Sequence, residues 1–236
     1  DGGEEPIDPE GGDDGWIIPN YEGYISPSNY DDYELVWADE FEGSEINTNN
    51  WGFDIGGHGW GNNERQFHTS RNAYVKDGML VIRAQEAEYG GNPYTSSRLK
   101  TQGKQNFLYG RIDIRARLPE GQGMWPALWM LGSNFSEVSW PKSGEIDIME
   151  MLGGSNREFT VYGTAHWNNG GLNADYSPAS YGGSKTKTDG KSLSDQFHVF
   201  SIVWTSNSII WYLDDVQYHT MALNNSASLL PFRKEF

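Results

Sequence analysis

Cysteine is absent from the 236 residues of the chain. This absence excludes disulfide bonds, cysteine-ligated metal sites and a thiol nucleophile. The sequence also lacks an apolar run of about 18 residues, so no transmembrane helix is expected. The opening stretch, DGGEEPIDPEGGDDG, lacks the basic and apolar regions of a signal peptide, and we expect such a peptide to have been removed or never present.

Basic side chains are scarce, because 17 Lys and Arg stand against 33 Asp and Glu, for a formal net charge of -16. Binding to the phosphates of nucleic acids or anionic lipids requires clustered positive charge. We therefore expect no nucleic-acid partner and no membrane insertion. A neutral polymer or a small molecule is easier to accommodate than a strongly sulfated polymer.

Helix-like segments are few, and are limited to SLSDQ and the C-terminal ASLLPFRKEF. Elsewhere, apolar and polar residues alternate with the period of a β-strand, in short segments separated by Gly, Asn, Pro and Ser. This pattern predicts an all-β fold, a two-sheet antiparallel sandwich. The alternating segments are residues 33–41, 78–86, 107–118, 126–132, 144–152, 159–167, 197–205 and 208–220.

The composition predicts one folded domain behind a tail. Residues 1–15 are acidic, rich in Gly and Pro and have almost nothing to bury, so they are predicted to be a flexible tail or linker. Residues 16–236 are predicted to form a single domain, since sandwiches of this length commonly have one core. Within 208–220, Asp214 and Asp215 are predicted to be the tip of a tight hairpin.

Three carboxylates, Glu145, Asp147 and Glu150, occur within six residues of SGEIDIMEMLGG. In a regular strand, Glu145 and Asp147 point to one face, whereas Glu150 points with Ile148 into the core. One extra residue, bulged at Ile148–Met149, would return Glu150 to the face of the other acids, and bulges are frequent next to active sites. The spacing therefore predicts a β-bulge.

Three acids on one strand face suit more than one kind of site. Carboxyl groups about 5 to 5.5 Å apart are typical of retaining glycoside hydrolysis, while inverting enzymes separate them by about 6.5 to 9.5 Å. Crowded carboxylates titrate as a coupled set, and repulsion raises at least one pKa, as a general acid near neutral pH requires. A divalent cation such as calcium also binds such oxygens. The spacing leaves catalysis, metal binding and a solvated polar face open.

Tryptophans flank the acidic strand on its N-terminal side. Trp125 and Trp140 stand beside Gly or Pro at turns, and we expect both to contact a ligand, because the CH faces of sugar rings stack on indoles. Trp129 lies in the alternating ALWML, a pattern that favours a place in the core.

The motifs GEIDIMEMLG and WPALWMLG resemble glycoside hydrolase family 16, in the branch with one additional residue before the last glutamate. Residues 56–69, 96–119 and 162–167 are similar to the laminarinases, or endo-1,3-β-glucanases, of that branch. The resemblance runs from about Tyr33 to Phe236. It implies a concanavalin A-like β-jelly-roll with a substrate cleft across its concave sheet. It also implies a retaining endo-hydrolase of β-1,3 bonds in laminarin-type β-glucan.

Two alternatives stay open beside this activity. The first keeps the chemistry and changes the polymer to mixed-linkage β-glucan or agar. The second is a non-catalytic glucan-binding module or an inactive fragment, which three crowded acids disfavour because a binder gains little from their mutual repulsion.

The resemblance also assigns roles to residues. It implies that Glu145 is the nucleophile, that Glu150 is the acid/base and that Asp147 positions and tunes the nucleophile. Candidate substrate contacts are Trp125, Trp129, Trp140, Asn63, Glu64, Arg98 and His166. Three of these have structural alternatives: Asn63 as a turn residue, Arg98 as the partner of a sheet-edge acid, and His166 as a half-buried histidine.

The resemblance implies no cofactor for catalysis but a structural calcium ion, with Glu42 and Gly78 as candidate ligands. Family members usually continue beyond the position of Phe236 with two further strands, one of which completes the calcium site. By this comparison, C-terminal strands are missing here. Since a polysaccharide is too large to enter a cell, we expect a secreted or cell-surface protein, and we expect a monomer.

Overall fold

The structure is a computed structural model that describes residues 21–236, so the predicted tail at 1–15 lies outside the described residues. The chain divides into two compact units. In the described part, the first unit comprises residues 36–105 and the second comprises residues 21–35 together with 106–236. None of the helices in the described part is long and apolar enough to span a membrane.

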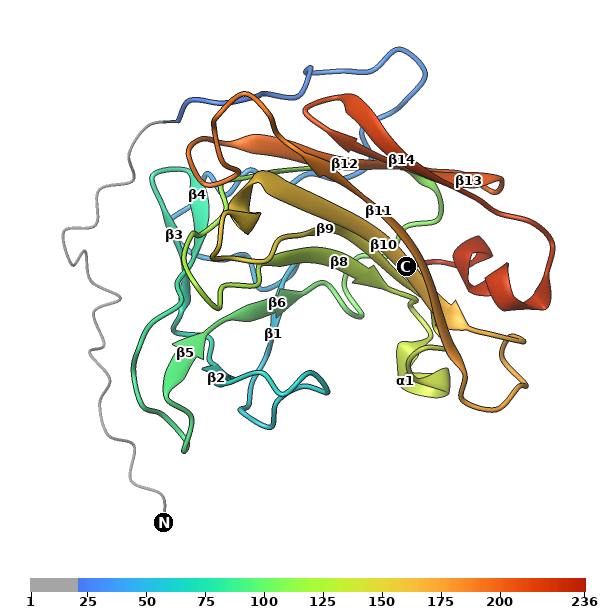
Figure 1. The fold of residues 1–236 in the computed structure, drawn as a ribbon, viewed down its shortest axis with the longest axis horizontal. Helices are drawn as coiled ribbons and strands as arrows, with labels where there is room; N and C mark the ends of the chain where they lie inside the picture. The colour runs from blue at the N-terminus through green and yellow to red at the C-terminus, as the bar shows by residue number, and fades with distance from the viewer. Residues whose placement is uncertain (1–20) are drawn as a thin grey trace. The chain divides into compact units, whose positions relative to one another are not determined.

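The first unit contains three two-stranded sheets (Figure 1). In the hairpin of β3 and β4, Asp77 and Gly78 occupy the turn with positive φ angles of 52° and 73°, the backbone that a two-residue hairpin requires. The antiparallel pairs are β1 (Gly52–Asp54) with β6 (Arg98–Lys100) and β3 (Ala73–Lys76) with β4 (Met79–Ile82), and the parallel pair is β2 (Gln66–His68) with β5 (Tyr94–Ser96).

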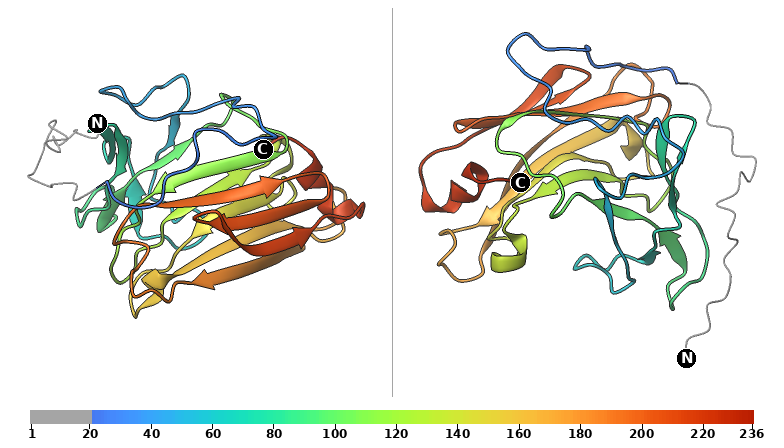
Figure 2. Two further views of the ribbon diagram at one scale, coloured as in Figure 1. Left: turned by 90° about the horizontal axis from the view of Figure 1, so that it is seen from above. Right: turned by 180° about the vertical axis from the view of Figure 1, so that it is seen from behind.

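The second unit contains two four-stranded antiparallel sheets that lie over one another as two layers (Figure 1, Figure 2). One has the order β11-β10-β9-β8 and the other the order β14-β13-β12-β7. The predicted two-sheet antiparallel sandwich is confirmed. The strands are β7 (Gly110–Ala116), β8 (Ala127–Leu131), β9 (Glu145–Glu150), β10 (Thr160–Asn168), β11 (Pro178–Thr186), β12 (His198–Trp204), β13 (Ser208–Leu213) and β14 (Val216–Ala222).

The core of the second unit contains buried residues from both of its sheets, and in β10 and β13 these residues alternate along the strand. In β13 the buried positions are Ile209, Trp211 and Leu213, and in β10 they include Val161 and Ala165.

Two of the predicted elements differ in the structure. Residues 33–41 form no strand, and Leu35 and Val36 are each 78% exposed. An alternating pattern becomes a strand only where another strand pairs with it, and no strand in the described residues does so. SLSDQ forms a turn, whereas the C-terminal segment contains the 3-10 helix η2 (Ala227–Arg233). The remaining helices are α1 (Phe135–Val138) and the 3-10 helix η1 (Arg157–Phe159).

The predicted hairpin tip at Asp214 and Asp215 is confirmed, with positive φ angles of 51° and 61° between β13 and β14. The Asp214 side chain also leaves the turn to bind β12. Its carboxylate lies 2.7 Å from His198 Nδ1 and accepts the backbone N–H of Val199 at 2.9 Å.

The segment from residue 21 to residue 30 crosses the outer face of β7. The Tyr30 hydroxyl donates to Asp113 at 2.5 Å, and Ser26 donates to the same carboxylate at 2.9 Å. The Arg115 guanidinium donates to the backbone oxygens of Tyr24 and Tyr21. Side chains of β7 therefore hold this segment in place.

Candidate active site

The bulge predicted in the acidic strand is present in β9. Leu128 of β8 pairs with Met149, whereas the next residue of β8, Trp129, pairs with Asp147. Ile148 is therefore the extra residue, and the pairing of β9 with β10 shifts register at the same place. Ile148 and Met149 are consecutive, yet both belong to the hydrophobic core, which a regular strand with alternating faces does not allow.

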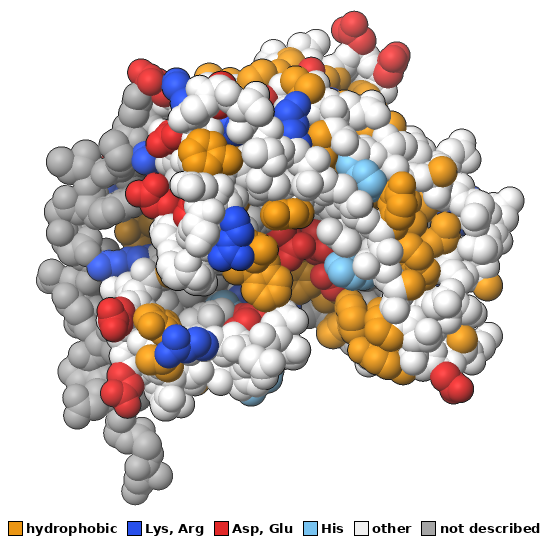
Figure 3. Space-filling view, viewed as in Figure 1, with side chains coloured by type: hydrophobic (Ala, Val, Ile, Leu, Met, Phe, Trp, Pro, Cys, Tyr) orange, Lys and Arg blue, Asp and Glu red, His pale blue; other side chains and the backbone are white. Residues whose placement is uncertain are grey.

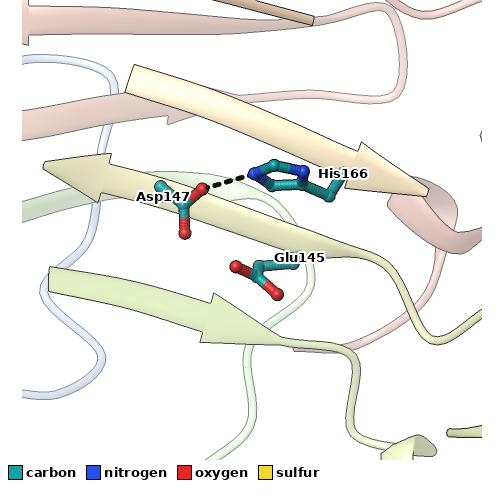
Figure 4. A group of neighbouring side chains, drawn as sticks. All are labelled: Glu145, Asp147 and His166. Atoms are coloured by element: carbon teal, nitrogen blue, oxygen red, sulfur yellow. Dashed lines mark ion pairs between the residues drawn. The ribbon is translucent and has the colours of Figure 1, made fainter. Parts of the chain in front are cut away.

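The bulge brings the three acids to one face of the sheet. Directly paired residues of neighbouring strands share a face, and His166 of β10 pairs with Glu145. Asp147 points to this same face, since His166 Nε2 lies 3.0 Å from its carboxylate (Figure 4). Glu150 is half-buried rather than part of the core, so it too leaves the apolar side.

Burial and crowding set the charge of this group. Burial, followed by the negative charge of Asp147, raises the pKa of Glu145 to about 8. Asp147 also hydrogen-bonds the Glu145 side chain. Since a hydrogen bond between two carboxyl groups needs a proton, the pair is built to share one.

The same causes act on Glu150. Burial and then the charge of Asp147 raise its pKa. The indole N–H of Trp125 donates to Glu150 at 2.9 Å and partly offsets this rise, because it stabilises the carboxylate. A carboxyl group that keeps its proton to a higher pH is suited to act as a general acid.

The pKa of His166 is raised as well, which favours a positive charge on its imidazole. Its hydrogen bond with Asp147 is the main cause of a raised pKa, which burial partly offsets and the charges of Glu145 and Glu150 reinforce. The imidazolium form therefore persists to a higher pH than usual beside the three acids.

Aromatic side chains surround these acids. Trp140 hydrogen-bonds Glu145, and its ring centroid lies 6.4 Å from that of His166 and 6.1 Å from that of Tyr176. Trp125 is 48% exposed and Tyr176 is 67% exposed, so both present apolar rings to solvent. In Figure 3, acidic and histidine side chains lie side by side with hydrophobic side chains around them. Sequence reasoning missed Tyr176, although an aromatic residue in the polar loop NADYSPAS is a signal that could have found it.

Trp129 does not lie in the core, contrary to the expectation from its alternating segment. Its neighbours Leu128 and Met130 pack against the core, and Trp129 faces the other way, paired with Asp147. The prediction placed the wrong face of this strand toward the core. The residues of ALWML are all apolar, so the pattern does not distinguish the two faces. This orientation agrees with its assignment as a substrate contact.

Three candidate substrate contacts belong to the first unit. Asn63 is exposed and has a φ of 57°, a turn backbone that Asn tolerates, as its structural alternative requires. Arg98 pairs with Asp54 of the neighbouring strand at 3.0 Å, and its guanidinium lies 4.8 Å from the ring centroid of Trp60. Arg98 thus has the sheet-edge acid of its structural alternative.

Glu64 also takes part in a polar group of the first unit. Its carboxylate accepts from Gln66 at 2.6 Å and lies 3.2 Å from His68 Nε2. Burial raises its pKa, but the hydrogen bonds from His68 and Asn62 outweigh burial and lower it overall. Glu64 is therefore an ionised, hydrogen-bonded side chain.

One group of side chains in the described residues could bind a metal ion. Glu145, Asp147 and His166 each offer one ligand atom, and these atoms lie within 4.8 Å of one another. Glu42 and Gly78 are exposed, and neither belongs to such a group within residues 21–236.

A family model for "Glycosyl hydrolases family 16" matches residues 60–234, which include all three acids and the strands that carry them. The chain belongs to this family. Family 16 hydrolases need no cofactor for catalysis. The two layered sheets of the second unit agree with the β-jelly-roll sandwich of the family.

Relatives of this family 16 chain are similar over most of its length. A β-glucanase from Rhodothermus marinus is 43% identical over 79% of the chain. The laminarinase catalytic domain from Thermotoga maritima is 45% identical, with a TM-score of 0.73 over 81% of this chain and 78% of that one. An endo-β-1,3-glucanase from Pyrococcus furiosus is 38% identical, with a TM-score of 0.73 over 85% of this chain and 80% of that one.

The matched relatives are often longer than this chain. The chain spans 65% of the length of the Rhodothermus marinus protein and 28% of the length of the clotting factor G alpha subunit of Tachypleus tridentatus.

Proposed function

We propose that the protein is a retaining, endo-acting hydrolase of β-1,3-glucosidic bonds in laminarin-type β-glucan. The observation that carries the proposal is the group of three half-buried or buried acids on one face of β9, with raised pKa values at Glu145 and Glu150. The names of the relatives, laminarinase and endo-β-1,3-glucanase, support the choice of substrate.

In the first step, Glu150 donates its proton to the glycosidic oxygen as the bond from that oxygen to the anomeric carbon breaks. A carboxylate oxygen of Glu145 attacks the same carbon and forms a glycosyl ester. Glu145 must be ionised to attack, although burial and the charge of Asp147 raise its pKa. The positive charge of His166 lowers the pKa of Glu145 and so favours the ionised form.

In the second step, Glu150, now a carboxylate, removes a proton from water as the water oxygen attacks the anomeric carbon. The ester bond breaks, Glu145 leaves as a carboxylate, and Glu150 is protonated again. Two inversions give net retention. His166 supports this cycle because its positive charge offsets part of the negative charge of the acids.

The aromatic rings supply sugar binding around this chemistry. Trp125, Trp129 and Trp140 present indoles on or beside the face of the acids, where the CH faces of glucose units stack. The uncharged substrate suits a chain with a formal net charge of -16.

Product analysis on laminarin tests the proposal. Oligosaccharides of several lengths should appear early, and NMR that resolves the anomers should show the β-anomer first. The variant Glu145→Gln should lose at least about 10⁴-fold in kcat, as removal of a nucleophile does. Initial release of the α-anomer, or full activity of Glu145→Gln, would contradict the mechanism.

The polymer is tested separately from the chemistry. A panel of laminarin, mixed-linkage β-glucan, agar and cellulose separates the leading substrate from the alternatives. The highest kcat/KM on laminarin is the expected outcome, and a preference for agar would replace the substrate while keeping the catalytic residues.

A structural calcium ion is a further proposal that rests on the family resemblance. The side chains do not make a site around Glu42 and Gly78, so ligation there would depend on backbone carbonyl groups. Thermal unfolding in calcium chloride and in a chelator tests this proposal, and an unchanged melting temperature would contradict it.

Secretion or display at a cell surface, and a monomeric state, are also proposals. The size of the polymeric substrate, which cannot enter a cell, supports the first of them. Cell fractionation of the source organism and sedimentation of the purified protein test them.

A further inference from the structure

We propose that Trp211, on the sheet opposite to the acids, is a positioning residue that holds the catalytic bulge of β9 and thereby aims Glu150. This inference rests on the proposed function. Trp211 lies on β13 and is completely buried. Its indole N–H donates to the backbone oxygen of Asp147 at 2.8 Å, a hydrogen bond that joins the two sheets.

The hydrogen bond ends at the residue where the register of β9 shifts. Asp147 is the last regularly paired residue before the extra Ile148, and Glu150 is the first acid beyond it. A bulge locally disrupts the ladder, so the backbone there depends more on contacts from outside its own sheet. Trp211 supplies such a contact from behind the acids, while their side chains face the other way.

A glycine on the neighbouring strand β10 leaves space for this ring. Gly163 of β10 lies opposite the bulge, between Tyr162 and Thr164, where the pairing with β9 skips. A Cβ atom at Gly163 would lie 2.4 Å from Trp211 Cδ1 and 2.7 Å from its Nε1. Glycine at this position is therefore what lets the indole approach β9.

The two partners of this contact face different environments. Trp211 belongs to the apolar core together with Ile148 and Met149, the two consecutive buried residues of the bulge. An apolar side chain of the same size could fill this place in the core. Only a hydrogen-bond donor, such as the indole N–H, also fixes the position of the Asp147 carbonyl oxygen. Asp147 in turn carries the side chain that contacts His166 and raises the pKa of both glutamates.

Trp204 offers a matched control within the same core. It lies on the adjacent strand β12, is also completely buried, and donates its indole N–H to a backbone oxygen, that of Phe232, at 2.9 Å. Trp204→Phe and Trp211→Phe therefore remove the same group from the same depth. Only the second removes a hydrogen bond to the catalytic strand.

Both variants should lose similar stability, with melting temperatures about 2–4 °C lower. Trp211→Phe should also lose about 10- to 100-fold in kcat on laminarin with KM nearly unchanged, because the acid/base is misplaced while the sugar contacts stay. Trp204→Phe should keep the kcat of the wild type. Equal kcat in the two variants would show that Trp211 is a structural residue only.

A change of leaving group tests whether the effect passes through Glu150. In a dinitrophenyl laminarioligosaccharide, the dinitrophenolate leaving group departs without needing a proton. The kcat/KM on this substrate reports formation of the glycosyl ester, and Trp211→Phe should reduce it much less than it reduces the kcat/KM on laminarin. An equal loss on both substrates would overturn the inference.

Titration of ¹³C-labelled glutamate by NMR separates this inference from the proposed activity. The pKa of Glu150 should fall toward its ordinary value in Trp211→Phe, as the looser strand exposes the side chain, and should not move in Trp204→Phe. An unmoved pKa would contradict the inference even if laminarin is cut, and inactivity of the wild type on laminarin would contradict the function alone. If Trp211→Phe does not fold, benzothienylalanine at this position keeps the ring volume and removes the donor.

Discussion

Two aspartate–histidine pairs in the second unit consist of the same residue types but lie in different surroundings. Asp147 and His166 lie 3.0 Å apart on neighbouring strands of one sheet, and the imidazole is partly exposed. Asp214 and His198 lie 2.7 Å apart at the end of the other sheet, with the imidazole completely buried. The distances are similar, but the surroundings are not.

The neighbours of each pair decide its role. Around Asp147 stand two further carboxyl groups, so each proton in the group affects the others. Around Asp214 stands the backbone N–H of Val199, which occupies its second oxygen. We interpret the pair whose aspartate is bonded to the backbone as structural, and the pair that is linked to two further carboxyl groups as able to move protons.

The largest difference between the pairs should appear on replacing each aspartate. Asp147→Asn removes the negative charge that contacts His166 and acts on both glutamates, and it should lower kcat on laminarin by about 10²–10³-fold. Steady-state kinetics together with a thermal melt measure it. A loss of activity explained wholly by unfolding would erase the distinction between the two pairs.

The matched change, Asp214→Asn, should act on stability alone. The variant weakens the contacts with His198 and Val199 and should lower the free energy of unfolding by about 1–3 kcal/mol. Urea unfolding measures this loss. Among enzyme molecules that remain folded, kcat should equal that of the wild type, and a reduced kcat would show that the two pairs are coupled.

Part of the pH dependence of stability should come from His166 of the first pair and the two glutamates beside it. The folded-state pKa values of Glu145, Glu150 and His166 are all raised, so the folded chain binds protons more tightly than the unfolded chain. Their stabilising contribution is complete below the unfolded values and is lost as pH rises through the folded values, for Glu145 between about 4.5 and about 8.

Melting temperatures measured from pH 4 to pH 9 test this direction. In Glu145→Gln the decline across the window should be shallower, with about 2–4 °C for each kcal/mol removed. An unchanged slope would show that Glu145 does not titrate in this range.

The smallest expected effect is a shift of the pH profile by Trp125→Phe. The indole N–H lowers the pKa of Glu150, so its removal should raise that pKa and move the basic limb of kcat/KM upward by less than about one pH unit. A downward shift would contradict the assignment of Glu150 as the proton donor.

The sequence predicted the acids and their bulge because both follow from local rules. Side chains alternate along a strand, so the three-residue gap before Glu150 already requires an extra residue. The β13–β14 hairpin was predicted for the same kind of reason. Residues 33–41 show the limit of such local rules. Their residues alternate as in a strand, but none of the described strands pairs with them.

Contacts between strands were not predictable from local patterns. The pairing of His166 with Asp147 depends on the register of β9 against β10, and the bond from Trp211 depends on the packing of two sheets. Trp129 was placed on the wrong side because every residue of ALWML is apolar. For His166 and Trp211 the missing information is how distant strands pair and pack, which one sequence does not contain.

The segment held by β7 shows that ordered contacts of the described chain extend well ahead of its first strand. Because Arg115, Asp113 and Arg111 bind residues from Tyr21 to Tyr30, the first strand at Gly52 is not the natural boundary for shortening the chain. A protein cut after Tyr30 would leave the Asp113 carboxylate without two of its donors. Proteolysis should accordingly be slow within residues 21–30, well ahead of the first strand at Gly52.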